Sequence, residues 1–240
     1  GKLFGTGWLN SGTLTKGKKQ RYYIDPDLHA AVVGLGTTKK GTYYYVRPKV
    51  GYVVRGKWSD AEGNVWLGDK KTGALPKTND AWMVSKKWDG SYQRYYIKDH
   101  RALTGIFATD EGTYSYGIPK KGYVARGAYK TERGWVLANN DGILKTRSWL
   151  VTDKFGKKGV LQRYYLQDDG TVARKRVISP KKDNVTYYAY ALSSGKILRG
   201  AKKVGKWTYL ADNNGKLVTA KKAKWLYTKK FGTKTKQRYY

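Results

Sequence analysis

The chain has 240 residues, and its 49 Lys and Arg against 17 Asp and Glu give a formal net charge of +32. The absence of cysteine excludes disulfides, thiolate metal sites and a cysteine nucleophile, and no apolar run approaches the roughly 18 residues that a membrane-spanning helix requires. The positive charge is spread along the whole chain, which favours a polyanionic partner.

The tetrapeptide Gln-Arg-Tyr-Tyr recurs at residues 20–23, 93–96, 162–165 and 237–240. A tryptophan precedes each occurrence, which predicts a single repeat array over residues 1–240. The predicted parts are the tail of a preceding repeat at 1–7, three copies at 8–81, 82–148 and 149–224, and a partial copy that forms a capping hairpin at 225–240.

Each full copy contains three units. The first unit runs from the tryptophan through the tetrapeptide, the second follows at residues 41–56, 112–127 and 185–200, and the third at 64–75, 134–144 and 206–217. A unit consists of a short strand, a polar turn, a second strand rich in Tyr or Trp, and a loop with a turn-forming residue before an aliphatic one. This pattern predicts β-hairpins and sustains no helical period.

A single hairpin buries too little apolar surface to be stable in water, so each hairpin must shield its neighbour. The sequence therefore predicts an all-β fold, an elongated β-solenoid of stacked β-hairpins.

The motifs that carry a family resemblance are Gly-Trp at residues 7–8, Arg-Tyr-Tyr at 21–23, Thr-Tyr-Tyr-Tyr at 42–45, and Asp-Gly followed by Ile143 or Val172. In this order they resemble the cell-wall-binding repeat family, which includes choline-binding repeats of streptococcal surface proteins and lysins and glucan-binding repeats of glucosyltransferases. The resemblance covers essentially the whole chain. It implies three hairpins per superhelical turn, with the tetrapeptide marking one face.

The chain also departs from the choline-binding pattern. In that family a quaternary ammonium lies between aromatic rings of successive hairpins. Here a tryptophan opens only the first unit of each copy, and the only methionine is Met83. A free cation would also approach a surface of charge +32, so choline is expected to bind only as part of an anionic polymer.

Aromatic residues that recur with the repeat are candidates for ligand grooves, where their rings can stack on sugars. The alternative is that the tryptophans pack between hairpins as core. Neighbouring strand residues point to opposite faces, so one Tyr of each tetrapeptide faces a groove. The candidates are Trp8, Tyr22, Tyr23, Trp82, Tyr95, Tyr96, Trp149, Tyr164, Tyr165 and Trp225.

A further set of tryptophans, Trp66, Trp135 and Trp207, recurs among aliphatic residues in the third units. Their surroundings favour a place in the core.

Two rows of arginine recur with the repeat and are candidates for binding phosphate or carboxylate groups. For the first row, the alternative is a structural one, with each guanidinium lying over a neighbouring tyrosine. The first row is Arg21, Arg94, Arg163 and Arg238, and the second row is Arg55, Arg126 and Arg199.

The sequence gives little support for catalysis. Most acidic residues fall in predicted turns, and His29 and His100 occupy the same loop of consecutive copies without a recurring nucleophile or acid. No metal, phosphate-loop or triad motif is present. We expect no catalytic residue, no metal and no cofactor.

The main hypothesis is a noncatalytic module, extracellular and attached to the wall of a Gram-positive bacterium, that binds wall polysaccharide or a teichoic-type polymer at several weak sites. One alternative is a neutral glucan-binding module. Another is a structural stalk or adhesin that binds sulfated or acidic host glycans. No motif predicts a specific nucleic-acid partner.

Overall fold

A computed structural model describes residues 7–38, 40–182, 185–219, 225–229 and 235–239. Residues 1–6, which carry the predicted tail of a preceding repeat, and Tyr240, which ends the fourth tetrapeptide, lie outside these ranges. The chain divides into two compact units, Gly1–Arg126 with Asn140–Ile143 and Gly127–Asn139 with Leu144–Tyr240. Each unit is described separately below.

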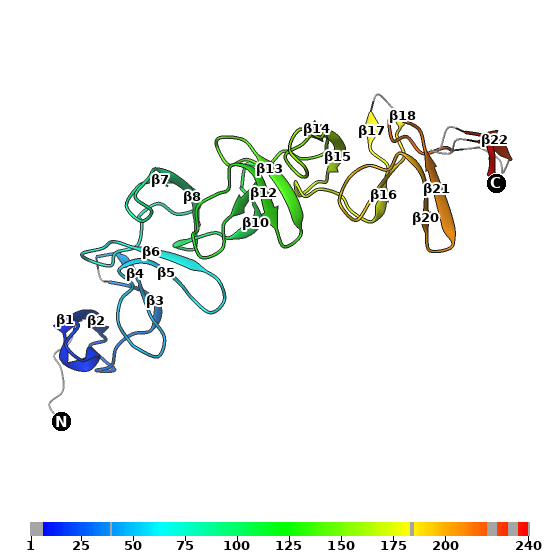
Figure 1. Cartoon of the computed structure of the whole chain (residues 1–240). Coiled ribbons are helices and arrows are strands. Elements are labelled where there is room, and N and C mark those ends of the chain that lie inside the picture. The colour runs from blue at the N-terminus through cyan, green and yellow to red at the C-terminus, as the bar shows by residue number, and fades with distance from the viewer. Residues whose placement is uncertain (1–6, 39, 183–184, 220–224, 230–234, 240) are drawn as a thin grey trace. The chain divides into compact units, whose positions relative to one another are not determined.

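Antiparallel two-stranded hairpins follow one another along the chain (Figure 1). In the first copy they pair β1 (Gly7–Ser11) with β2 (Gln20–Ile24), β3 (Gly34–Thr37) with β4 (Tyr43–Val46), and β5 (Gly56–Ser59) with β6 (Val65–Gly68). A short 3₁₀ helix, η1 (Thr13–Thr15), lies in the first turn.

The second copy repeats this order with one additional strand. Its hairpins pair β7 (Ala81–Ser85) with β8 (Gln93–Lys98), β10 (Gly105–Ala108) with β11 (Tyr114–Gly117), and β12 (Gly127–Thr131) with β13 (Gly134–Ala138). The additional strand β9 (Arg101–Ala102) pairs with β8 and contacts β6, so β5, β6, β9, β8 and β7 form one sheet.

The third copy and the partial fourth copy continue the series. The pairs are β14 (Ser148–Thr152) with β15 (Gln162–Leu166), β16 (Arg176–Ile178) with β19 (Ala189–Ala191), β17 (Lys181–Lys182) with β18 (Val185–Thr186), β20 (Gly200–Val204) with β21 (Trp207–Ala211), and β22 (Leu226–Thr228) with β23 (Gln237–Tyr239). The described residues contain no α-helix. The predicted all-β fold of β-hairpins is confirmed.

Backbone hydrogen bonds from the loops join each hairpin to the one before it. The amide of Val53 donates to the carbonyl of Arg21 in the preceding hairpin at 2.8 Å, and the next amide, of Val54, donates to Tyr45 in its own hairpin at 2.8 Å. The same alternation recurs with Val124 and Ala125, and with Ile197 and Leu198. Successive hairpins are therefore joined through backbone N–H and C=O groups, which need a hydrogen-bond partner wherever a loop is buried.

Glycine in these loops is required by both conformation and space. Gly73 and Gly142 have φ of +78° and +81°, and a Cβ at either would lie 2.3 Å from Val53 or 2.1 Å from Val124 in the loop before it. Gly215 repeats the arrangement against Ile197. In two loops a histidine rather than a glycine has the left-handed backbone conformation, with φ of 49° at His29 and 60° at His100.

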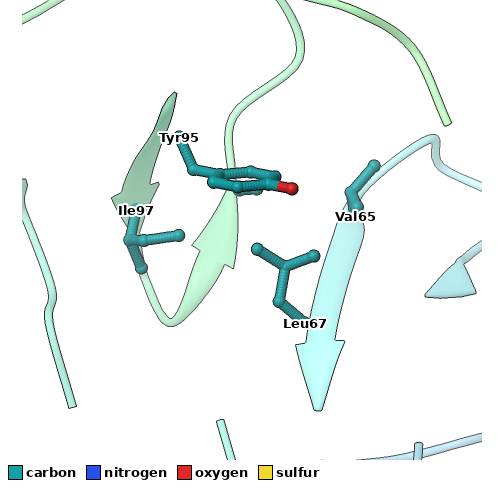
Figure 2. Close-up of a cluster of buried hydrophobic side chains, with 5 residues drawn as sticks. Val65, Leu67, Tyr95 and Ile97 are labelled. Carbon is teal, nitrogen blue, oxygen red and sulfur yellow. The ribbon is translucent and has the colours of Figure 1, made fainter. Parts of the chain in front are cut away.

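Small apolar clusters between neighbouring hairpins replace a single core. Figure 2 shows one of them, in which Tyr95 and Ile97 of β8 pack against Val65 and Leu67 of β6. The Tyr95 ring is fully buried, and its hydroxyl donates to the Asp89 carboxylate at 2.5 Å. Burial, and next this hydrogen bond, raise the pKa of Tyr95 above its ordinary value.

We predict that Gly142→Ala lowers the free energy of unfolding by about 2–5 kcal/mol. The left-handed backbone costs about 1–2 kcal/mol, and the clash with Val124 adds about 1–3 kcal/mol. Urea unfolding followed by tryptophan fluorescence measures the loss. The control is Gly112→Ala, because Gly112 has φ of +75° but nothing within 4 Å of its Cβ position. Equal losses in the two variants would contradict the packing explanation.

We also predict opposite responses to removal of two buried tyrosine hydroxyls. Tyr95→Phe loses a hydrogen bond to a carboxylate and should destabilise the fold by about 1.5–3 kcal/mol. The Tyr164 hydroxyl is buried and has no hydrogen-bond partner among the described residues, so Tyr164→Phe should leave stability at pH 7 unchanged or raise it.

The pH dependence of stability provides a second readout for Tyr164. Burial raises the pKa of Tyr164 in the folded chain, so above about pH 10 the unfolded chain loses this proton first and stability falls. Unfolding curves at pH 7 and pH 10.5 should show a smaller alkaline loss in Tyr164→Phe than in the unmodified chain. An unchanged alkaline loss would contradict this assignment.

Candidate ligand-binding surface

An arginine lies over a tryptophan in the first hairpin of every copy. In β1 and β2, Trp8 is paired with Tyr23 and Asn10 with Arg21, so Trp8 and Arg21 are diagonal neighbours on one face. The guanidinium carbon of Arg21 lies 3.9 Å from the Trp8 ring centroid. The corresponding distances are 4.0 Å for Arg94 and Trp82, 4.3 Å for Arg163 and Trp149, and 4.1 Å for Arg238 and Trp225.

Three of these four guanidinium groups also bind the loop that follows the third hairpin of their copy. Arg21 donates from Nη1 to the carbonyl oxygen of Thr72 at 2.6 Å, in the residue before Gly73. The equivalent bonds join Arg94 to Asp141 at 2.8 Å and Arg163 to Asn214 at 2.6 Å. These three arginines therefore have structural contacts, with tryptophan as the nearer ring. Arg21 and Arg163 also lie over a tyrosine, at 6.0 Å from Tyr44 and 5.3 Å from Tyr187.

The two tyrosines of each tetrapeptide have different surroundings. The first is buried in all three full copies, with Tyr22 at 3%, Tyr95 at 0% and Tyr164 at 0% exposure. The second lies beside the tryptophan, and its ring centroid is 5.0 Å from Trp8 for Tyr23 and 5.1 Å from Trp149 for Tyr165. The second tyrosine is thus the one on the candidate groove face.

The second copy departs from this arrangement. Tyr96 contacts Trp82 at 5.2 Å, but Phe107 stacks on it at 5.5 Å and leaves it only 3% exposed. The groove face of this copy is therefore covered by the following hairpin.

The tryptophans are enclosed from the next hairpin as well. Tyr44 lies edge-on to Trp8 at 4.5 Å, and Tyr187 lies edge-on to Trp149 at 5.2 Å. Burial raises the pKa of Tyr165 and of Tyr187 above the ordinary value, so both rings stay neutral near pH 7. At Trp8 and Trp149 the ring face under the guanidinium is therefore not open to an external cation. Trp225 of the partial fourth copy is 56% exposed.

The second arginine row lies at the surface. Arg55, Arg126 and Arg199 are all exposed. Arg55 donates to the Lys19 carbonyl at 2.8 Å and to the Gln20 side-chain oxygen at 3.0 Å. These partners are neutral, so the charge of Arg55 remains available to an anion.

The prediction of core positions for the third-unit tryptophans is right for Trp66 and wrong for Trp207. Trp66 is 4% exposed and stacks on Tyr45 at 3.8 Å, whereas Trp207 is 63% exposed. The pairing between the two strands of each hairpin explains the difference. The strand that carries Trp66 is aligned by the pair Gly56–Gly68, and the equivalent pair in the third copy is Gly200–Ala211. Counting two residues back from Gly68 and from Ala211 aligns Trp66 with Tyr209, not with Trp207. Tyr209 accordingly stacks on Tyr190 at 4.5 Å.

Trp135 is half-buried, and it does not occupy the strand position equivalent to that of Trp66. In its hairpin Gly127 faces Ala138, so the residue aligned with Trp66 is Val136, which is fully buried. A shift of one residue along a strand moves a side chain to the other face.

Sequence reasoning missed two arginines that occur in only one copy. Arg174 donates to the carbonyl of Arg133 at 3.0 Å, and Arg47 lies over Trp58 and Tyr52. A recurring motif cannot reveal them because neither belongs to one. Elsewhere, no group of three His, Asp or Glu side chains suited to a metal occurs in the part of the chain that the structure describes. No helix within these described ranges is long and apolar enough to span a membrane.

Comparison with known proteins gives one curated relative. Glucosyltransferase-S of Streptococcus mutans serotype c is 25% identical over 222 residues, which cover 84% of this chain and 14% of that protein. The chain resembles the choline-binding and glucan-binding repeat family. No family model matches it. The chain spans a small part of the relative's length, so the relative's whole activity does not transfer to it.

Three solved structures show partial similarity to the chain. CbpJ from Streptococcus pneumoniae TIGR4 is 19% identical, with coverage of 93% of this chain and 90% of that one and a TM-score of 0.44. Choline binding protein F from Streptococcus pneumoniae is 17% identical, with coverage of 95% and 90% and a TM-score of 0.40. Alternansucrase in complex with isomaltononaose is 20% identical, with coverage of 89% and 16% and a TM-score of 0.27.

We predict that Arg94→Lys lowers the free energy of unfolding by about 2–4 kcal/mol although it keeps the charge. Lysine replaces neither the planar contact with Trp82 nor the fixed fork that reaches Asp141, and such contacts contribute about 0.5–1 kcal/mol and about 1.5–3 kcal/mol. Thermal and urea unfolding measure the loss. The control, Arg126→Lys, should change stability by less than about 0.5 kcal/mol. Equal effects would show that Arg94 has no such structural role.

Proposed function

We propose that the chain is a noncatalytic, extracellular module that attaches its parent protein to the wall of a Gram-positive bacterium by binding anionic wall polymers of the teichoic type. The observation that carries the proposal is the Arg–Trp pair of each first hairpin. Arg21, Arg94 and Arg163 occupy the tryptophan faces on which a ligand cation would lie, and the chain has a net charge of +32. Both features favour an anionic ligand over free choline.

Repetition supplies the affinity in this proposal. The exposed arginines Arg55, Arg126 and Arg199 recur once per copy, and each alone gives a weak, salt-screened attraction. A polymer with regularly spaced phosphates or carboxylates can occupy several of these positions together. Linked weak sites of this kind raise the overall affinity by about 10²–10⁴ without a deep pocket.

The second candidate function is binding of a neutral glucan, and the exposed aromatics favour it. Trp207 is 63% exposed and Tyr92 is 64% exposed, so their rings are open to stack on sugar faces. The similarity to glucosyltransferase-S supports the same candidate. Stacking on neutral sugars does not depend on salt, which separates the two candidates experimentally.

We predict that the chain sediments with purified Gram-positive walls, and that binding falls at least about tenfold when the salt concentration rises from about 0.05 to about 0.5 M, because screening weakens exposed charge pairs. Walls stripped of anionic polymers should bind equally weakly, and excess free choline should not elute the chain.

Three controls distinguish the alternatives. Binding that survives both salt and stripping would contradict the anionic-polymer proposal. Retention on neutral α-glucan at high salt, lost in Trp207→Ala, would establish the glucan function. Retention on heparin without any binding to walls would indicate an acidic host glycan as the ligand.

A further inference from the structure

A hollow of about 280 Å³ lies in the first copy, and cationic side chains line it without any acidic residue among them. Its cations are Arg47, Arg55 and Lys57, and its other polar and aromatic walls come from Gln20, Tyr52 and Trp58. We call it the paired-arginine hollow, because two of the three cations keep an uncompensated charge.

Arg47 is held in place by aromatic side chains. Its Nη1 donates to the Tyr52 hydroxyl at 2.8 Å, and its guanidinium carbon lies 4.7 Å from the Trp58 ring centroid and 5.3 Å from that of Tyr52. It forms no ion pair with any of the described residues. A guanidinium has five N–H donors, and Tyr52 uses one of them.

Arg55 is held by oxygen atoms that carry no charge, the Lys19 carbonyl at 2.8 Å and the Gln20 amide oxygen at 3.0 Å. Lys57 differs, because its amine forms an ion pair with Asp89. The net positive charge of the hollow therefore comes from Arg47 and Arg55, and both guanidinium groups are already oriented in the unliganded chain.

We propose that the paired-arginine hollow binds a single oxyanion, the phosphate or carboxylate of one unit of an anionic polymer. Two oriented guanidinium groups match the fork geometry that these anions accept, and their prior orientation lowers the entropy lost on binding. The volume is below the roughly 300–1,000 Å³ of pockets for drug-sized ligands, so one charged group fits rather than an oligosaccharide. The inference rests on the proposed binding of anionic polymers.

A stacked sugar is a poorer occupant of the hollow. The Trp58 ring has Tyr45 stacked near it at 5.6 Å and Arg47 at 4.7 Å. The protein's own Tyr45 and Arg47 thus occupy the Trp58 ring. A ligand in the hollow would therefore be bound mainly by the guanidinium N–H groups.

The arginine pair occurs in the first copy alone among the three full copies. Ile118 and Leu192 take the position of Arg47, because each donates its amide to the loop residue that corresponds to Tyr52. Arg126 corresponds to Arg55 but has Ile118 in place of the second arginine. Arg126 therefore serves as a control for Arg55, because its removal lowers the net charge equally without removing a member of an arginine pair.

The test is an NMR titration of the full chain with glycerol phosphate and, separately, with glucuronate, at constant ionic strength. The Trp58 indole N–H signal, identified by its absence in Trp58→Phe, reports on the hollow. We expect a saturable shift with at least one probe, and the stronger probe identifies phosphate or carboxylate as the preferred group. Arg47→Gln and Arg55→Gln should each weaken binding about tenfold or more, since a charged hydrogen bond is lost.

Arg126→Gln removes the same charge and should weaken binding less than about twofold. An equal loss in Arg126→Gln and Arg55→Gln would overturn the inference, because only the general positive field would then attract the anion. Should Arg47→Gln fail to fold, Arg47→Lys keeps the charge without the fork, and its binding should still be weaker than that of the unmodified chain.

The wall-binding assay separates this inference from the proposed function. No Trp58 response to either probe, in a chain that still binds walls through anionic polymers, would overturn the hollow and leave the function standing. A Trp58 response lost in Arg47→Gln, in a chain that does not bind walls, would support the hollow and overturn the function.

Discussion

The arrangement of each copy depends on the arginine of the tetrapeptide. The Arg21 carbonyl accepts the amide of Val53 from the second hairpin, and its guanidinium lies on Trp8 and donates to Thr72 in the turn of the third hairpin. One residue thereby contacts all three hairpins of its copy. The guanidinium is held by a ring face and one carbonyl, and its buried Nε has no hydrogen-bond partner among the described residues. The contact with the ring and the carbonyl offsets part of the cost of keeping this charge where hairpins meet.

This constraint divides the positive residues by function. Arg21, Arg94 and Arg163 of the first row join hairpins. The second row and the paired-arginine hollow present charge to the surroundings. The distinction also underlies the proposal that this chain binds an anionic polymer rather than free choline. A tryptophan covered by the protein's own guanidinium cannot receive a ligand ammonium on that face, although its surroundings are as aromatic as a cation site requires.

The sequence predicted the hairpins because turn residues and aromatic strands recur together. The sequence does not specify which tyrosine of a pair is buried. Alternation places the two tyrosines on opposite faces of the strand, and only the packing of the hairpin determines which face is buried. Trp207 was placed in the core wrongly for a different reason. It shares a face with Tyr209, but it lies two residues nearer the turn, and Tyr209 holds the position aligned with Trp66. Arg47 belongs to no recurring motif, so the repeat does not predict its role. Its contact with Trp58 depends on the packing of β5 against the end of β4, which the sequence pattern does not specify.

The loop hydrogen bonds between neighbouring hairpins also bear on mechanical load. Within each compact unit, loop bonds join neighbouring hairpins and the tetrapeptide arginine adds a bond to the loop after the third hairpin. We expect tension to be resisted by these local bonds rather than by a single shared core. Once a hairpin opens, its slack chain lengthens the molecule and relieves the force on the next. In the proposed attachment role, we expect such a chain to yield to load in steps rather than all at once.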